Sequence, residues 1–355
     1  MTPVLSEDGT LYCVGSDALY AISRRGEVTW TFAFPHNEKG GSFSPAIGPN
    51  GVIFVASESV VNDMIPSFFR RPSRPGLYAL DAKGRILWKY AQGKPRSSPM
   101  IDKDGHVYIA MGGEIVMLTQ EGKVVRKYSG ISGSGFVWTA LNEDERTPLL
   151  FCLYDDALYA WTPNGMLRTM PLDRKSGWSI GLVIDKRYNL VYALMSEGIL
   201  VCADAPNLKV KWRFRTKGEL ASYPAVTDGR IYVGGADTTG QGKVLSHHHL
   251  LYAVSHTGML LWELDLDDEL RNPPCLDKRG YIYLTTRSEK DRAAYVYSVT
   301  PQGRIQGRVR IAQCRYMSAP ILGPDRTVYC YGTRAFAIGE ASSKKAKRQG
   351  STLTR

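Results

Sequence analysis

The stretch GLYALDAKGRILW at residues 76–88 decides the fold, because versions of it return along the whole chain. It combines a short apolar strand, a turn at Gly84 and a second strand that carries Trp88. Each copy begins upstream with a proline and two apolar residues, followed by a tight turn and an alternating strand. The copies begin at Pro3, Pro45, Pro99, Pro224, Pro273 and Pro320, with weaker starts near Trp138 and Ile180. Four strands in a unit of about 45 residues predict a β-propeller.

We therefore predict an all-β chain that folds as a single β-propeller of four-stranded antiparallel blades. The strands of a blade are named A to D from the inside outward; the first blade has them at 3–5, 10–15, 18–23 and 27–32. Eight A strands predict eight blades, with seven as the alternative. Residues 1–340 form the propeller and residues 341–355 a basic tail. Residues 350–354 could supply the fourth strand of the last blade; a three-stranded blade, or a strand from a longer natural N-terminus, would be the alternatives.

Four tryptophans fall at the same place on strand D of their units: Trp30, Trp88, Trp212 and Trp262. A single tryptophan at this place could bind a ligand. Four in register are better interpreted as packing anchors between neighbouring blades, because indole rings bury a large area and need a partner for one N–H group.

The net charge of the chain and its distribution indicate which partners the protein could bind. The net charge is +11, and the tail contributes to it through Lys344, Lys345, Lys347, Arg348 and Arg355. Such a tail is either a solvated end or a binding site for a polyanion. Polyanion binding is our third functional hypothesis, although nucleic acid is not the expected partner.

The six cysteines show no CxxC pair and are interpreted as small buried hydrophobic residues in the reduced state. With no apolar run long enough for a transmembrane helix, we expect a soluble cytoplasmic protein, or an exported one if a leader peptide precedes this sequence.

The repeat resembles the pyrroloquinoline-quinone-like (PQQ-like) β-propeller family. The resemblance is carried by residues 76–81 with Gly84 and Trp88, by Ser98 to Ile101 and by Asp228 to Gly234. It implies a ring of seven or eight blades. Quinone-dependent dehydrogenases of the family hold their cofactor beside a disulfide between adjacent cysteines, together with a calcium ion. This chain has no adjacent cysteines and is far shorter, so we expect neither quinoprotein catalysis nor a cofactor.

The loops between strands B and C suggest a binding face. Most are short, but three are enlarged, at about residues 57–75, 235–249 and 286–293, and all three belong to one face of a propeller. Long loops in a regular scaffold are more often functional than accidental. We predict a non-catalytic protein-interaction scaffold; the alternative for the first loop is that it packs down on the rim. The predicted partner-binding residues are Ile65, Phe68, Phe69, Arg70, Arg71 and Arg74.

The alternative function is a small-molecule enzyme or sensor that uses the axial mouth of the propeller. The predicted axial residues lie at the starts of the A strands: Arg96, Trp138, Trp178, Tyr223, Arg271, Asn272, Arg315 and Tyr316. The competing interpretation is that Trp138 and Trp178 simply plug the centre. The run His247 to His249 has no structural metal spacing, because adjacent strand residues point to opposite faces, so we predict no metal site.

Overall fold

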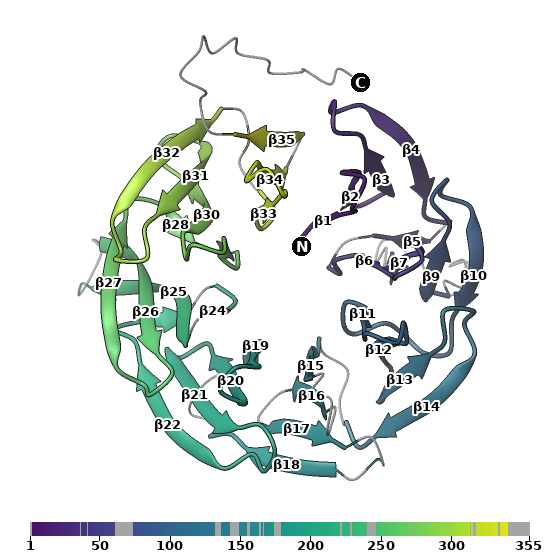
Figure 1. Ribbon diagram of the computed structural model, residues 1–355, viewed down its shortest axis with the longest axis horizontal. Helices are drawn as coiled ribbons and strands as arrows, with labels where there is room; N and C mark the ends of the chain where they lie inside the picture. The colour runs from purple at the N-terminus through teal and green to yellow at the C-terminus, as the bar shows by residue number, and fades with distance from the viewer. Residues whose placement is uncertain are drawn as a thin grey trace, which may run out of the picture. The chain divides into compact units, whose positions relative to one another are not determined.

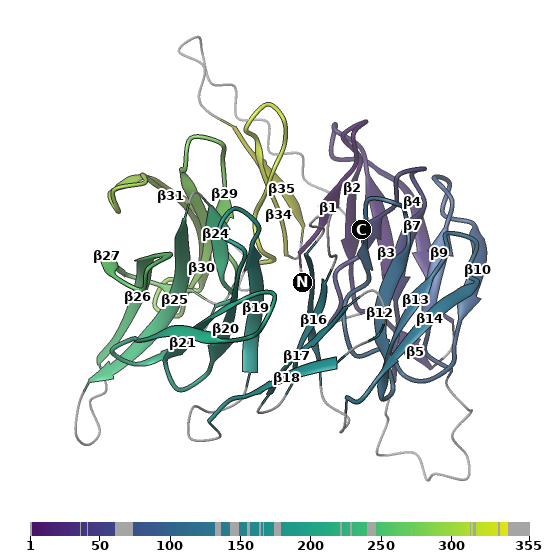
Figure 2. The ribbon, with the colours of Figure 1, turned by 60° about the horizontal axis from the view of Figure 1, so that its bottom comes forward.

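The computed structural model is drawn in Figures 1 and 2. It describes residues 2–35, 37–40, 42–60, 74–131, 136–142, 149–154, 157–162, 165, 167–173, 179–220, 222–227, 229–239, 246–270, 272–312, 314, 317–332 and 334–339. All the regular secondary structure in these residues is β-strand. Among them, no helix has the length and apolar character needed to cross a bilayer.

The chain divides into two compact units, and the division falls after Thr139, within a strand. The first unit holds three complete antiparallel blades. Blade 1 is β1 (Val4–Leu5), β2 (Leu11–Val14), β3 (Ala18–Ile22) and β4 (Val28–Ala33). Blade 2 is β6 (Ala46–Ile47), β7 (Ile53–Ala56), β9 (Leu77–Leu80) and β10 (Ile86–Tyr90). Blade 3 is β11 (Met100–Ile101), β12 (Val107–Met111), β13 (Glu114–Leu118) and β14 (Val124–Ser129). A separate two-stranded sheet joins β5 (Glu38–Lys39) to β8 (Glu58–Ser59).

The remaining blades repeat this pattern. Blade 4 is β15 (Trp138–Asn142), β16 (Leu149–Tyr154), β17 (Ala157–Trp161) and β18 (Leu167–Pro171). Blade 5 is β19 (Ser179–Asp185), β20 (Leu190–Met195), β21 (Ile199–Asp204) and β22 (Val210–Arg215). Blade 6 is β24 (Ala225–Thr227), β25 (Arg230–Thr239), β26 (Ser246–Ser255) and β27 (Leu260–Leu266), with β23 (Glu219–Leu220) added to it. Blade 7 is β29 (Cys275–Leu276), β30 (Ile282–Ser288), β31 (Ala293–Val299) and β32 (Ile305–Ile311), with β28 (Glu269–Leu270) added.

Blade 8 has three strands in the described part of the chain: β33 (Ile321–Leu322), β34 (Val328–Tyr331) and β35 (Ala335–Ile338). The strand predicted at 350–354 and the basic tail lie outside the described residues. Eight successive antiparallel sheets, joined in sequence order from strand A to strand D, are the blades of a β-propeller. The predicted all-β, eight-bladed fold class is therefore confirmed.

Strands B and C form the core, because they are covered on both faces. In blades 2 and 3, Phe54, Leu77, Ile109 and Val116 are buried in one shared hydrophobic cluster. These side chains come from β7, β9, β12 and β13, so one blade packs its B and C strands on those of the next. This stacking explains why the strands are almost continuously apolar rather than strictly alternating.

The strand-D tryptophans fasten neighbouring blades, as predicted. Trp88 Nε1 donates a hydrogen bond to the Gln120 carbonyl in the C–D turn of blade 3, at 2.6 Å. Gly122 in that turn has a φ of +81°, and a Cβ there would lie 2.7 Å from the indole. The turn glycine is thus required both by its backbone conformation and by the ring beneath it. The same pairs recur as Trp30 with Ala82 and Gly84, Trp212 with His256 and Gly258, and Trp262 with Pro301 and Gly303.

A β-bulge sets the direction of each of these tryptophans. Ile86 pairs with Leu80 and Trp88 with Ala79, so Leu87 is the extra residue of strand D. The same irregularity occurs in β4, β14, β22, β27 and β32. A bulge bends and twists its strand and breaks the regular ladder. It therefore aims the tryptophan at the next blade and also makes the outer edge a poor template for another strand.

Candidate functional site

Three blades carry additional strand pairs at the edge where B meets C. In blade 2, β5 pairs with β8 through Glu38↔Ser59 and Lys39↔Glu58. In blade 6, β23 pairs with β25, and in blade 7, β28 pairs with β30 (Figure 1). Each added strand comes from the connection that precedes strand A, called the D–A connection below. The blades concerned, 2, 6 and 7, are those with enlarged B–C segments, so enlargement and added strand go together.

Two of the three enlarged segments continue strands B and C of their blades. Strands β25 and β26 each run for ten residues and are paired from Arg230↔Ser255 to Thr239↔Ser246 (Figure 2). In blade 7, β30 continues to Ser288 and β31 begins at Ala293. The two segments predicted as enlarged, 235–249 and 286–293, thus contain the ends of longer strands. The added D–A strand supplies hydrogen-bond partners on the other side of strand B, which lets the hairpin extend.

A buried carboxylate anchors the added strand of blade 7. The side chain of Asp268 is 2% exposed and accepts hydrogen bonds from Tyr297 Oη at 2.7 Å and Arg308 Nη2 at 2.7 Å. The Arg308 guanidinium lies 3.8 Å from the ring centre of Tyr295 and also contacts Asp267, at 3.3 Å. Burial, followed by the hydrogen bond to Asp268, raises the pKa of Tyr297 well above its ordinary value. The phenol is therefore held as a hydrogen-bond donor.

Blade 2 repeats this anchor with different residues. The side chain of Glu38 is 5% exposed and binds Lys89 Nζ at 2.8 Å, while Tyr78 Oη donates to it at 2.7 Å. Ser57 Oγ donates to the same carboxylate at 2.7 Å. Tyr78 and Lys89 are cross-strand partners, as Tyr297 and Arg308 are in blade 7. One acid from the D–A connection is thus held by a strand-C tyrosine and a strand-D cation in both blades.

Blade 6 has the same arrangement with the charges exchanged. Lys217 from the D–A connection forms an ion pair with Glu263, which is the cross-strand partner of Tyr252. The Lys217 backbone N–H donates to Tyr252 Oη at 3.3 Å. The three anchors together place charged pairs at the B–C edges of blades 2, 6 and 7. These groups are engaged with one another, so the arrangement is suited to holding a rigid edge rather than to acid–base catalysis.

The predicted partner-binding residues fall mainly outside the described chain. Arg74 is described and exposed, three residues before the start of the buried strand β9. Ile65, Phe68, Phe69, Arg70 and Arg71 lie outside the described residues. The partner-binding role of all six stays a prediction.

Two of the four predicted axial residues that are described form hydrogen bonds within the scaffold. Arg96 is 4% exposed, and its Nη1 donates to the Gly112 carbonyl at 2.5 Å. Asn272 Nδ2 donates to Thr285 Oγ1 at 3.1 Å and to the Met317 carbonyl of blade 8 at 2.8 Å. Trp138 and Tyr223 are half-buried, and burial raises the pKa of Tyr223. Trp178, Arg271, Arg315 and Tyr316 lie outside the described residues, so an axial ligand site stays a prediction.

A repeated serine explains the position of Asn272 and was missed in the sequence. Ser97, Ser222 and Ser318 each stand two residues before a proline that starts strand A. Their Oγ atoms accept the strand-B N–H groups of Ala110, Gly234 and Tyr331 at 3.0, 2.7 and 2.9 Å. Asn272 stands in the same place before Pro274 and bonds to Thr285 on its own strand B. The Ser-x-Pro spacing was the signal that could have revealed this backbone clamp.

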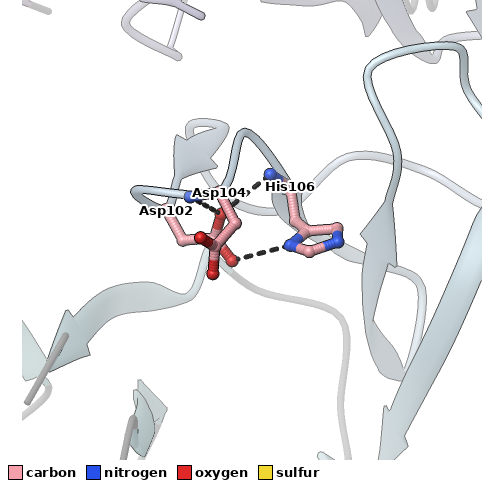
Figure 3. Close-up of side chains that lie close together, drawn as sticks. All are labelled: Asp102, Asp104 and His106. Carbon is pink, nitrogen blue, oxygen red and sulfur yellow. Dashed lines mark hydrogen bonds and ion pairs between the residues drawn. The ribbon is translucent and has the colours of Figure 1, made fainter. Parts of the chain in front are cut away.

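One group of potential metal ligands occurs in the described residues: Asp102, Asp104 and His106, in the A–B turn of blade 3 (Figure 3). Asp102 accepts the backbone N–H groups of Asp104 at 3.0 Å and His106 at 2.8 Å, and its other oxygen lies 3.0 Å from His106 Nδ1. Asp81 and Asp277 accept backbone N–H groups two and four residues ahead in the same way. The Asp102 geometry is accounted for by a turn that side-chain hydrogen bonds stabilise, and we assign no metal to it.

The propeller fold agrees with comparisons to known proteins. Residues 15–177 match the PQQ_2 family model, described as outer membrane protein assembly factor BamB. The match covers somewhat less than half of the chain, and these residues are similar to that family. The resemblance drawn from the Leu-Tyr-Ala-Leu-Asp strand and its Gly–Trp pair is thereby confirmed. No curated protein matches the chain in sequence.

Solved structures are similar in fold over nearly the whole chain. BamB from Moraxella catarrhalis is 16% identical with a TM-score of 0.57, covering 96% of this chain and 98% of that one. The computationally designed Ika8 protein is 11% identical with a TM-score of 0.66, covering 95% of each chain. Virginiamycin B lyase from Staphylococcus aureus is 11% identical with a TM-score of 0.54, covering 93% of this chain and 90% of that one. At these identities the likeness shows the fold alone. One fold can host many unrelated functions.

Proposed function

We propose that the protein is an interaction scaffold that presents the B–C edges of its blades to a protein partner. The observation that carries the proposal is the coincidence of three features in blades 2, 6 and 7. Each has an enlarged B–C segment, an added strand from the D–A connection and a tyrosine-linked ion pair that holds this connection. Loop growth without a role would not be expected to bring the same reinforcement three times.

The added strands and their anchors suit recognition because they reduce the conformational entropy that is lost when a partner binds. A segment that is already paired and anchored loses less conformational freedom when a partner docks. The description of the matching family as an assembly factor points in the same direction. The alternative axial function has less support, since Arg96 and Asn272 direct polar atoms to carbonyl groups of the scaffold.

The test compares partner capture by the full chain, by a chain in which a short Gly-Ser link replaces residues 61–73, and by the double variant Phe68→Ala/Phe69→Ala. Met259→Ala is the control, because Met259 is 65% exposed at a C–D turn, away from the B–C edge. We expect a specific protein to co-purify with the full chain and with the control but not with the other two, at unchanged thermal stability. Capture of the same protein by the shortened chain would refute the role of this segment.

A further inference from the structure

The outer strands of blades 2 and 3 expose pairs of aliphatic side chains beside the C–D turns. Ile86 and Leu87 are each 52% exposed, and Val124 and Val125 are 44% and 48% exposed. The bulge explains the pairs: Leu87 and Val125 are the extra residues of their strands, which interrupts the alternation that would turn one neighbour inward.

The two pairs lie on adjacent blades of the first unit. Trp88, which follows Leu87 directly, packs beneath Gly122 and donates to the Gln120 carbonyl. Gly122 in turn precedes Val124 by two residues. The latch between these blades therefore brings the two aliphatic pairs to the C–D turns of neighbouring blades. We call Ile86, Leu87, Val124 and Val125 the aliphatic edge.

Exposed cations flank the aliphatic edge. Lys83, Lys123 and Arg126 are exposed, and the Arg85 side chain is 75% exposed. The acids on the same two turns are Asp81, which is paired with Arg85 at 2.7 Å, and Glu121. The C–D turn of blade 1 continues the pattern with exposed Arg24, Arg25, Glu27 and Val28. Cations therefore outnumber acids along the three turns.

We propose that the aliphatic edge and its cations bind the surface of an anionic lipid bilayer. Half-exposed aliphatic side chains bordered by lysine and arginine suit shallow insertion at a headgroup boundary, where the cations attract anionic lipid. A peptide strand is a less suitable occupant, because the bulges interrupt the ladder to which it would add. A lipid surface requires neither a groove nor a hydrogen-bond register. This proposal is independent of the B–C edge.

Blade 6 provides a matched control within the chain. Leu260 and Leu261 are 45% and 43% exposed at the equivalent bulge. The C–D turn there contains no lysine or arginine, and exposed Glu263 and Asp265 follow on β27. The apolar character is the same but this turn carries no lysine or arginine, so this edge is expected to bind an anionic surface weakly.

The experiment measures binding of the full chain to vesicles of phosphatidylcholine alone and of phosphatidylcholine with phosphatidylglycerol. We expect binding only to the anionic vesicles, and weaker binding as salt rises. The double variant Leu87→Ser/Val125→Ser keeps every charge, including those of the tail, and should bind about tenfold more weakly. Lys83→Glu/Lys123→Glu should weaken binding further, by roughly fivefold or more per site.

Leu261→Ser should bind as the unaltered chain does. The proposal is overturned if Leu87→Ser/Val125→Ser leaves vesicle affinity unchanged, which would assign any binding to the tail or to another surface. It is also overturned if Leu261→Ser weakens binding equally. Circular dichroism of each variant checks that the substitutions at these exposed positions leave the fold intact.

Discussion

At the scale of single residues, the glycine of each latched C–D turn is constrained in two ways. It combines a positive φ with an indole ring directly below it, as Gly122 does above Trp88. Either demand alone favours glycine, and together they explain why Gly and Trp recur as a pair in the sequence. Gly51 in blade 2 also has a positive φ, of +73°, but no atom lies within 4 Å of where its Cβ would be. A comparison of Gly122 with Gly51 therefore separates the energetic cost of backbone strain from the cost of overpacking.

We expect Gly122→Ala to lower the free energy of unfolding by about 2–5 kcal/mol, from left-handed strain plus overpacking against Trp88. Gly51→Ala should cost only about 1–2 kcal/mol, since only the backbone strain applies. Urea unfolding of both variants, followed by tryptophan fluorescence, measures the difference. Equal losses of unfolding free energy in the two variants would show that the indole ring beneath Gly122 moves aside freely.

At the scale of elements, the D–A connection is held by one polar anchor for each reinforced blade. Asp268 in blade 7 is buried with an ion pair and a phenol hydrogen bond, so removing either partner leaves a carboxylate less well satisfied. The anchor also makes stability depend on pH. The pKa of Tyr297 is raised in the folded chain, so its contribution is fully present below the ordinary tyrosine pKa and is lost as pH rises toward the folded value.

We expect Tyr297→Phe to lower the free energy of unfolding by about 1 kcal/mol at neutral pH. Between pH 9 and 11, the unaltered chain should lose stability more steeply than the variant, because its unfolded state releases a tyrosine proton near pH ~10 that the folded state keeps. Denaturant unfolding at a series of pH values measures both slopes. Parallel curves would mean that Tyr297 titrates normally in the folded protein.

At the scale of the whole molecule, the six cysteines belong to the packed core rather than to a covalent framework. All six are free, and five of them are buried. Burial raises the pKa of Cys13 and of Cys202 to about 12 in each case. Since the thiolate is the reactive form, both thiols are protected by burial and by protonation. The sequence interpretation of the cysteines as small buried hydrophobic residues is thus confirmed for five of the six.

We expect thiol labelling at pH 8 to follow global unfolding at the buried cysteines, with Cys275, which is half-buried, reacting first. Mass spectrometry of the labelled chain, with and without denaturant, measures the order. A reducing agent should leave the unfolding midpoint unchanged. Rapid native labelling of Cys13 or Cys202 would contradict the burial of these groups.

Much of the architecture could be predicted from the sequence because each blade is encoded locally. The turn glycines, the apolar B and C strands and the strand-D tryptophans all lie within one repeat. The added strands could not be predicted in this way, since β5 and β28 pair with segments whose register depends on the neighbouring sheet. Arg96 and Asn272 were assigned to an axial mouth from their place at a strand start, yet their hydrogen bonds to Gly112 and Met317 form only in the folded chain.

The tryptophan latches run in one direction along the chain, and they are unevenly distributed. They join blade 1 to 2, 2 to 3, 5 to 6 and 6 to 7, whereas blades 3, 4 and 7 carry Arg126, Arg168 and Gly307 at the tryptophan position. Two latched triplets result, blades 1–3 and blades 5–7. Amide hydrogen exchange should therefore reveal two cooperative opening units, each protected as a block, with blades 4 and 8 exchanging earlier.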